Sequence, residues 1–145
     1  MSRIASWKNS ISIHAPADQV FAYVDEPMNY PTWLPNMVEV RNVIGEGIGQ
    51  QYEWTFKMGG LLHRGQTVIV EYVPHKSASH QIIGNIDALW EYDVEPQDEG
   101  TLLTIGVEYS VPIPVLGRLA EHIVVRELGR QFDVALQNVK DVMEA

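Results

Sequence analysis

Hydrophobic and polar residues alternate strictly over residues 51–58. Tyr52, Trp54, Phe56 and Met58 occupy every second position, and the four residues beside them are polar. Because successive side chains of a strand point to opposite faces, this period of two predicts a strand with one apolar face. A second stretch repeats the pattern with Ile86, Ala88, Trp90, Tyr92 and Val94. Aromatic faces of this kind on a curved sheet indicate a cavity for an apolar ligand.

The other elements follow from the same patterns and from turn residues. Residues 7–14 alternate and predict a first strand, and Pro16 and Asp18 fit the opening of a helix that ends before Pro27. Prolines limit residues 29–35 to a turn or two of helix. Further strands are expected near residues 37–44, 49–58, 61–73, 78–84, 86–95 and 101–110. Their short connectors, rich in glycine and other turn residues, favour antiparallel pairing.

Residues 115–143 have helical periodicity, but the apolar face changes along the helix. The first half places Leu116, Leu119, Ala120, Ile123 and Val124 on one face. The second half places Leu128, Phe132, Ala135, Val139 and Val142 on another, roughly a third of a turn away. Either the helix bends near Gly129, or its second half packs as core while Glu127 and Arg130, three residues apart and able to pair, face the mouth of a cavity.

The order of elements predicts an α+β fold, in which an antiparallel sheet wraps around a long C-terminal helix. The 145 residues are expected to form a single domain, residues 1–145. The chain has no cysteine, which excludes disulfides and thiolate metal sites and fits a cytoplasmic protein.

Charge and hydropathy narrow the range of partners. The net charge of −9 argues against nonspecific binding of nucleic acid and against an anionic membrane surface. No apolar run approaches the ~20 residues of a membrane span, so integral membrane association is not expected. The five histidines lack the spacing of a metal site, and no cofactor is expected.

Several stretches resemble one superfamily. Residues 13–24 (IHAPADQVFAYV) are similar to the strand-to-helix opening of the SRPBCC superfamily, which includes START-type lipid carriers, birch-pollen-allergen-like proteins, coenzyme-Q-binding proteins and polyketide cyclases. Further similar stretches are residues 30–33 (YPTW), 90–94 (WEYDV), 100–104 (GTLLT) and 136–140 (LQNVK). The resemblance implies the helix-grip fold, a seven-stranded antiparallel sheet around the C-terminal helix with two short helices after the first strand. Fold alone does not choose among the ligands and activities of the superfamily.

The leading hypothesis is a carrier that binds a lipid, quinone or polyketide-like molecule between the sheet and the C-terminal helix. Its apolar walls would be Tyr52, Trp54, Phe56, Trp90, Tyr92, Tyr109 and Ile123, and its polar anchors Arg64, Gln66 and Glu127. Such a site, mostly apolar with a few polar groups, is typical of small-molecule pockets. In the alternative interpretation the aromatic residues fill a solid core, and Arg64 and Gln66 reach water near the sheet edge.

The alternative function is a polyketide cyclase or dehydratase acting in the same cavity. It would use Glu127, with Tyr52 or Tyr92, as acid or base, and Arg64 would polarise a substrate carbonyl. Tyr30 and Trp33 are expected to wedge the short helical segment against the sheet. A protein-interaction module is a third hypothesis, and a homodimer is left open.

Overall fold

The computed structural model describes the backbone of residues 2–58, 60–84 and 87–145, and the side chains in these ranges apart from 2–5 and 111–124. The elements, in chain order, are β1 (Ser2–Ile13), α1 (Ala17–Asp25), the 3-10 turn η1 (Pro27–Asn29), α2 (Tyr30–Trp33), β2 (Met37–Ile44), β3 (Gln51–Met58), β4 (Leu61–Val73), β5 (Ser77–Gly84), β6 (Ala88–Gln97), β7 (Gly100–Pro112) and α3 (Ile113–Met143). The predicted helix-grip fold is confirmed, although β1 begins at Ser2 and not near residue 7. Ile86, expected on the second aromatic strand, lies outside the described residues.

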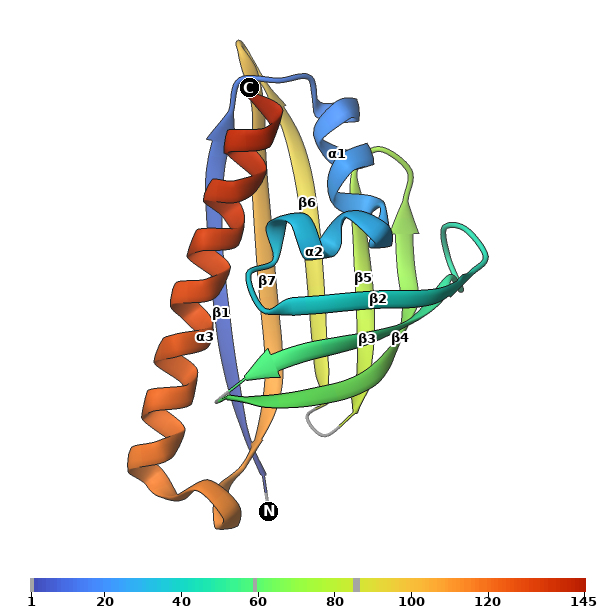
Figure 1. Ribbon diagram of the computed structural model, residues 1–145. Coiled ribbons are helices and arrows are strands. Elements are labelled where there is room, and N and C mark those ends of the chain that lie inside the picture. Colours follow the sequence, from blue (N-terminus) through green and yellow to red (C-terminus); the bar gives the residue numbers. More distant parts are fainter. Residues whose placement is uncertain (1, 59, 85–86) are drawn as a thin grey trace.

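The strands form one antiparallel sheet in the order β1-β7-β6-β5-β4-β3-β2. The sheet is strongly curved, so that β2 and β3 pass across β5, β6 and β7 (Figure 1). α3 runs alongside β1, and α1 and α2 lie at one end, over the concave side of the sheet (Figure 1). The concave face therefore meets helices on two sides, and most of the buried apolar side chains lie there.

The short helices form where the sequence predicts them. Pro16 stands before the first turn of α1, where a missing N–H leaves no hydrogen bond unmade, and Asp18 lies in that first turn. Val20, Phe21 and Val24 give α1 its buried face. In α2, Tyr30 and Trp33 are fully buried with their rings edge to face at 5.6 Å.

The long helix α3 continues past Gly129 without interruption, and Glu127 and Arg130 pair on its exposed side. Its second half buries Leu128, Ala135, Leu136 and Val139, much as the pattern predicts, but Val142 is half exposed. The face predicted for the first half, Ile123 included, falls on side chains outside the described residues. Gly129 lies against Trp7, since a Cβ there would be 3.4 Å from the indole Cδ1.

Candidate functional site

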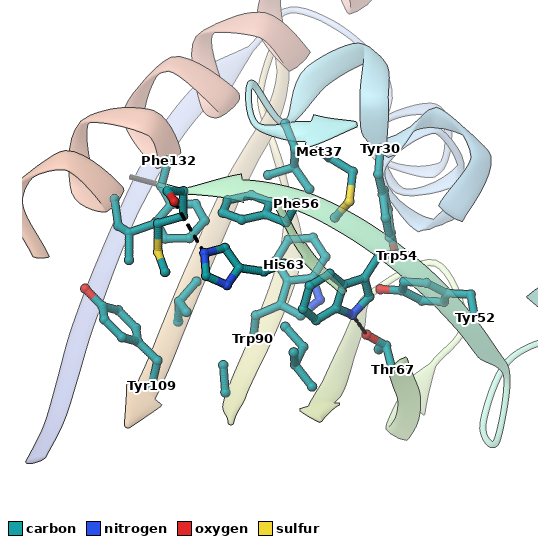
Figure 2. A pocket seen from close by; sticks show the side chains of 16 residues that line it. Tyr30, Met37, Tyr52, Trp54, Phe56, His63, Thr67, Trp90, Tyr109 and Phe132 are labelled. Carbon is teal, nitrogen blue, oxygen red and sulfur yellow. Dashed lines mark hydrogen bonds between the residues drawn. The ribbon is translucent and has the colours of Figure 1, made fainter. Parts of the chain in front are cut away.

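A cavity of about 130 Å³ lies between the concave face of the sheet and the helices α2 and α3. Figure 2 shows the side chains that line it, with aromatic rings on several sides. The lining residues are Tyr30, Leu34, Met37, Tyr52, Trp54, Phe56, Met58, His63, Thr67, Ile82, Ala88, Trp90, Val107, Tyr109, Leu128 and Phe132. None of these side chains is an acid, a lysine or an arginine, so the cavity is an apolar compartment with a few neutral polar groups.

The alternation of β3 builds one wall. Tyr52, Trp54, Phe56 and Met58 all face the cavity. Trp54 fits because β4 carries Gly65 directly opposite it, where a Cβ would stand 2.3 Å from the indole Cζ2. The indole N–H of Trp54 donates a hydrogen bond to Thr67 Oγ1 at 3.1 Å (Figure 2). A buried indole with its N–H satisfied contributes its apolar faces without a desolvation penalty.

The helices supply the opposite walls. Tyr30 of α2 packs edge to face on Tyr52 at 5.5 Å and on Trp90 at 5.6 Å between ring centroids. From α3, Leu128 and Phe132 reach the cavity, and Phe132 also packs on Trp7 at 5.1 Å. Tyr30 thus has the wedging role expected of it and forms part of the cavity wall as well.

The polar atoms on the described wall belong to tyrosine, threonine, tryptophan and histidine side chains. The ring of His63 points into the cavity, and its Nε2 lies 3.3 Å from the carbonyl oxygen of Met58, to which it donates (Figure 2). Burial raises the pKa of Tyr109. The hydroxyl of Tyr30 is buried and has no hydrogen-bond partner among the described residues. From the described lining residues a ligand would therefore meet hydroxyl, indole and imidazole groups and no carboxylate, ammonium or guanidinium group.

The structure places the predicted site residues in three environments. Five of them line the cavity, namely Tyr52, Trp54, Phe56, Trp90 and Tyr109. Tyr92 is buried but does not line the cavity. Arg64, Gln66 and Glu127 are exposed and outside the lining, and the side chain of Ile123 lies outside the described residues.

The expectation that Arg64 and Gln66 anchor a ligand is corrected by the parity of β4. His63, Gly65 and Thr67 are the residues of that strand on the cavity side, so the two residues between them point to the convex face. Glu127 is also misplaced by the prediction. It precedes Leu128, which faces inward, and its carboxylate accepts hydrogen bonds from Arg130 and Gln131 at the surface. These bonds lower the pKa of Glu127, the one from Arg130 most.

Sequence reasoning missed a buried chain of hydrogen bonds behind the aromatic wall. His80 of β5 is fully buried, with its Nδ1 3.1 Å from the hydroxyl of Tyr52 and its Nε2 3.2 Å from the hydroxyl of Tyr92. Tyr92 in turn donates to the Asp25 carboxylate at 2.6 Å, and Tyr72 donates to the other oxygen of Asp25 at 2.9 Å. The available signal was the alternation of β5, which puts His80 on the same face as Ala78 and Ile82.

The pKa shifts within this hydrogen-bond chain follow from its burial. Desolvation lowers the pKa of His80 from 6.5 to about 3, because the charged imidazolium loses its hydration. Burial raises the pKa of Tyr92, and the nearby Asp25 carboxylate raises it further. His80 is therefore neutral, and Tyr92 keeps its proton at neutral pH.

Two other types of site, a metal centre and a membrane-spanning helix, are absent from the described part of the chain. Its side chains contain no cluster of three or more histidine, cysteine or acidic residues able to hold a metal ion. None of its helices combines the length and the apolar character needed to cross a membrane.

Solved structures with the same fold extend over nearly the whole chain. An aromatase/cyclase from Streptomyces has 16% identity, a TM-score of 0.80, and coverage of 98% of this chain and 94% of its own. A START superfamily protein from Mycobacterium smegmatis has 16% identity and a TM-score of 0.79, and the match covers 96% of this chain and 97% of that protein. A protein from Thermus thermophilus has 17% identity, a TM-score of 0.83, and coverage of 94% and 95%.

At these identities the likeness establishes the fold and leaves the activity open. A search of curated protein sequences finds no match to this chain. Family membership comes from the sequence itself, because residues 5–144 match the family described as polyketide cyclase / dehydrase and lipid transport. The resemblance seen in the sequence is confirmed, and the chain belongs to the polyketide cyclase, dehydrase and lipid transport family.

Proposed function

We propose that this protein binds a hydrophobic small molecule in the cavity between the sheet and α3, and acts as its carrier. The observation that carries the proposal is the composition of the lining, which is aromatic and aliphatic with a few neutral polar atoms. A ligand gains free energy from each apolar surface that it removes from water, and the described lining contains no acid, lysine or arginine whose desolvation would oppose binding.

The shape of the walls favours a ligand with planar rings. Trp54, Phe56 and Trp90 present flat apolar surfaces, on which aromatic or quinone rings pack in offset or edge-to-face arrangements. Lipids and polyketides are named in the description of the family, and both are compatible with the lining. Among lipid, quinone and polyketide-like ligands, the aromatic walls support the ring-containing classes best.

A cyclase or dehydratase is the second candidate, supported by the family and by the Streptomyces aromatase/cyclase of the same fold. Such an enzyme needs an acid or base within hydrogen-bonding reach of the substrate. Glu127 and Arg64 do not line the cavity, so this role would fall to His63 or to a tyrosine of the wall. His63 is the one histidine among the described lining residues, and histidine is the side chain that most often transfers protons in enzymes.

The first test is to purify the protein gently from its own host, extract it with organic solvent and identify bound compounds by mass spectrometry. A stoichiometric apolar compound that is recovered unchanged after incubation supports a carrier. A compound that loses the mass of one water during incubation supports a dehydratase. A protein that carries no compound and also binds no lipid, quinone or polyketide from a panel would refute both proposals.

A matched pair of variants locates the ligand. Ala88→Leu adds bulk to the cavity wall, while Ala22→Leu adds the same bulk on the exposed side of α1. Tryptophan fluorescence reports binding, because Trp54 and Trp90 lie in the wall. Menadione should quench the fluorescence of the wild type and of Ala22→Leu, and Ala88→Leu should weaken its binding. Equal binding by both variants would place the ligand elsewhere.

A further inference from the structure

The buried hydrogen-bond chain has a single direction, which follows from counting its protons. Tyr92 has one hydroxyl proton, and it donates that proton to Asp25. In its contact with His80, Tyr92 must therefore accept, so Nε2 of His80 carries the hydrogen. A neutral imidazole then has a bare Nδ1, and Tyr52 donates to it.

This order leaves the hydroxyl of Tyr52 with lone pairs and no proton to offer. The chain ends at a carboxylate, and each donation along it polarises the next group, so the Tyr52 oxygen becomes a stronger acceptor than an isolated phenol. Burial raises the pKa of Tyr52, so its hydroxyl keeps the proton that it donates to His80. Tyr52 lines the cavity.

Tyr30 supplies the complementary group. Its ring packs on Tyr52 at 5.5 Å between centroids, and Figure 2 shows both tyrosines beside Trp54. The Tyr30 hydroxyl is fully buried, and its contact with Tyr52 does not reach hydrogen-bond geometry. A buried donor without an acceptor is costly, so this position favours an incoming oxygen atom.

We propose that Tyr52 and Tyr30 form a subsite for one hydroxyl group of the ligand, which donates to the Tyr52 oxygen and accepts from the Tyr30 hydroxyl. The inference rests on the proposed function and narrows it to planar apolar compounds that carry a phenolic or enolic O–H. Tyr52 and Tyr30 contact the ligand, whereas His80, Tyr92 and Asp25 act as positioning residues that fix which way Tyr52 donates.

The test compares three ligands of related shape in titrations followed by tryptophan fluorescence or calorimetry. 1-Naphthol carries the hydroxyl, naphthalene lacks it, and 1-methoxynaphthalene replaces its proton with a methyl group. One net hydrogen bond predicts that wild type binds 1-naphthol about fivefold more tightly than either comparison compound. Because 1-naphthol is the most water-soluble of the three, apolar contact alone would give the opposite order.

Variants assign the preference to the subsite. Tyr52→Phe keeps the ring and removes the acceptor, so the dissociation constant of naphthalene divided by that of 1-naphthol should fall from about five to about one. Tyr23→Phe is the matched control, since the Tyr23 hydroxyl bonds Thr32 outside the cavity and its removal should leave the ratio unchanged. An unchanged ratio in Tyr52→Phe would overturn the proposal even if all three ligands bind.

A second measurement needs no variant. The ¹⁵N shifts of His80 in the wild type should show the proton on Nε2, and the opposite tautomer would overturn the assignment of Tyr52 as acceptor.

In the ligand titrations, equal binding of the three compounds would refute the hydroxyl subsite and leave the apolar cavity function standing. Failure of all three to bind would refute the cavity function as well.

Discussion

The neutral, buried state of His80 predicts how the stability of this protein depends on pH. Folding lowers the pKa of His80 from 6.5 to about 3 because the ring is removed from water. Between these two values the unfolded chain holds a proton that the folded chain does not. This contribution to stability is fully present above the unfolded pKa and is lost as the pH falls toward the folded pKa.

The magnitude follows from the two pKa values. Integrating the proton difference from pH 7.5 to 5.5 gives a loss of about 1 kcal/mol in the free energy of unfolding, and near pH 5 the unfolded chain binds about one proton more than the folded chain. His80→Gln keeps a side chain that donates and accepts but removes the titration. The difference in unfolding free energy between wild type and His80→Gln should therefore shrink by about 1 kcal/mol over the same range.

The assay is urea denaturation followed by tryptophan fluorescence at several pH values, kept above the sequence pI of about 4.9 to limit association. A stability difference that does not change between pH 7.5 and 5.5 would refute the reasoning. If the variant does not fold, the ring signals of His80 in wild-type NMR spectra decide. A His80 titration midpoint between pH 5.5 and 7.5 in the folded protein would contradict the buried neutral ring.

Three further predictions concern the wall, the hydrogen-bond chain and the surface. Gly65→Ala should destabilise the protein by about 1–3 kcal/mol in urea, because its Cβ would stand 2.3 Å from the ring of Trp54, and an unaffected midpoint would contradict this close packing. Tyr92→Phe should lower the free energy of unfolding by about 1–3 kcal/mol, and by more than Tyr72→Phe, because Tyr92 has two hydrogen-bond partners in a buried site. Equal losses in the two variants would argue against the buried hydrogen-bond chain. Glu127→Gln should change the affinity for 1-naphthol by less than about twofold in fluorescence titrations, and a tenfold loss would place the carboxylate at the ligand.

The fold was predictable because its signals are local. Each signal depends only on neighbouring residues. The signals are the alternation on β3 and β6, the turn residues between strands, and a long stretch with a period of 3.6 residues in α3. The inner face of β3 was read correctly for the same reason, since Tyr52, Trp54 and Phe56 alternate with residues that are clearly polar.

β4 shows where such reasoning fails. Its convex face carries Leu62 and Val70, which are 59% and 43% exposed, so an apolar pattern appeared on the side that faces solvent. Arg64 and Gln66 share that face, and their apolar neighbours led to the prediction that both face the cavity. The pattern gave no means to tell which face of this strand would be covered, because that depends on the helices and on the curvature of the sheet.

The buried hydrogen-bond chain that links Asp25 to Tyr52 could not be predicted from the sequence, for a different reason. Its members come from α1, β3, β5 and β6, and only the folded sheet brings them together. The five histidines were scattered along the sequence, and spacing identifies a site only when its ligands are close in the chain. The alternation of β5 could have marked His80 as buried, but not its partners.

The pairing of β1 with β7 has a consequence for how the protein folds. Residues 2–13 align with residues 101–112, so β1 pairs with a strand that is made much later than itself. Pairing between such distant segments closes a long loop before it gains contacts, and domains rich in it fold in milliseconds to seconds. In the sheet β1 stands at the edge next to β7, so it gains this strand partner only after residues 101–112 have been made.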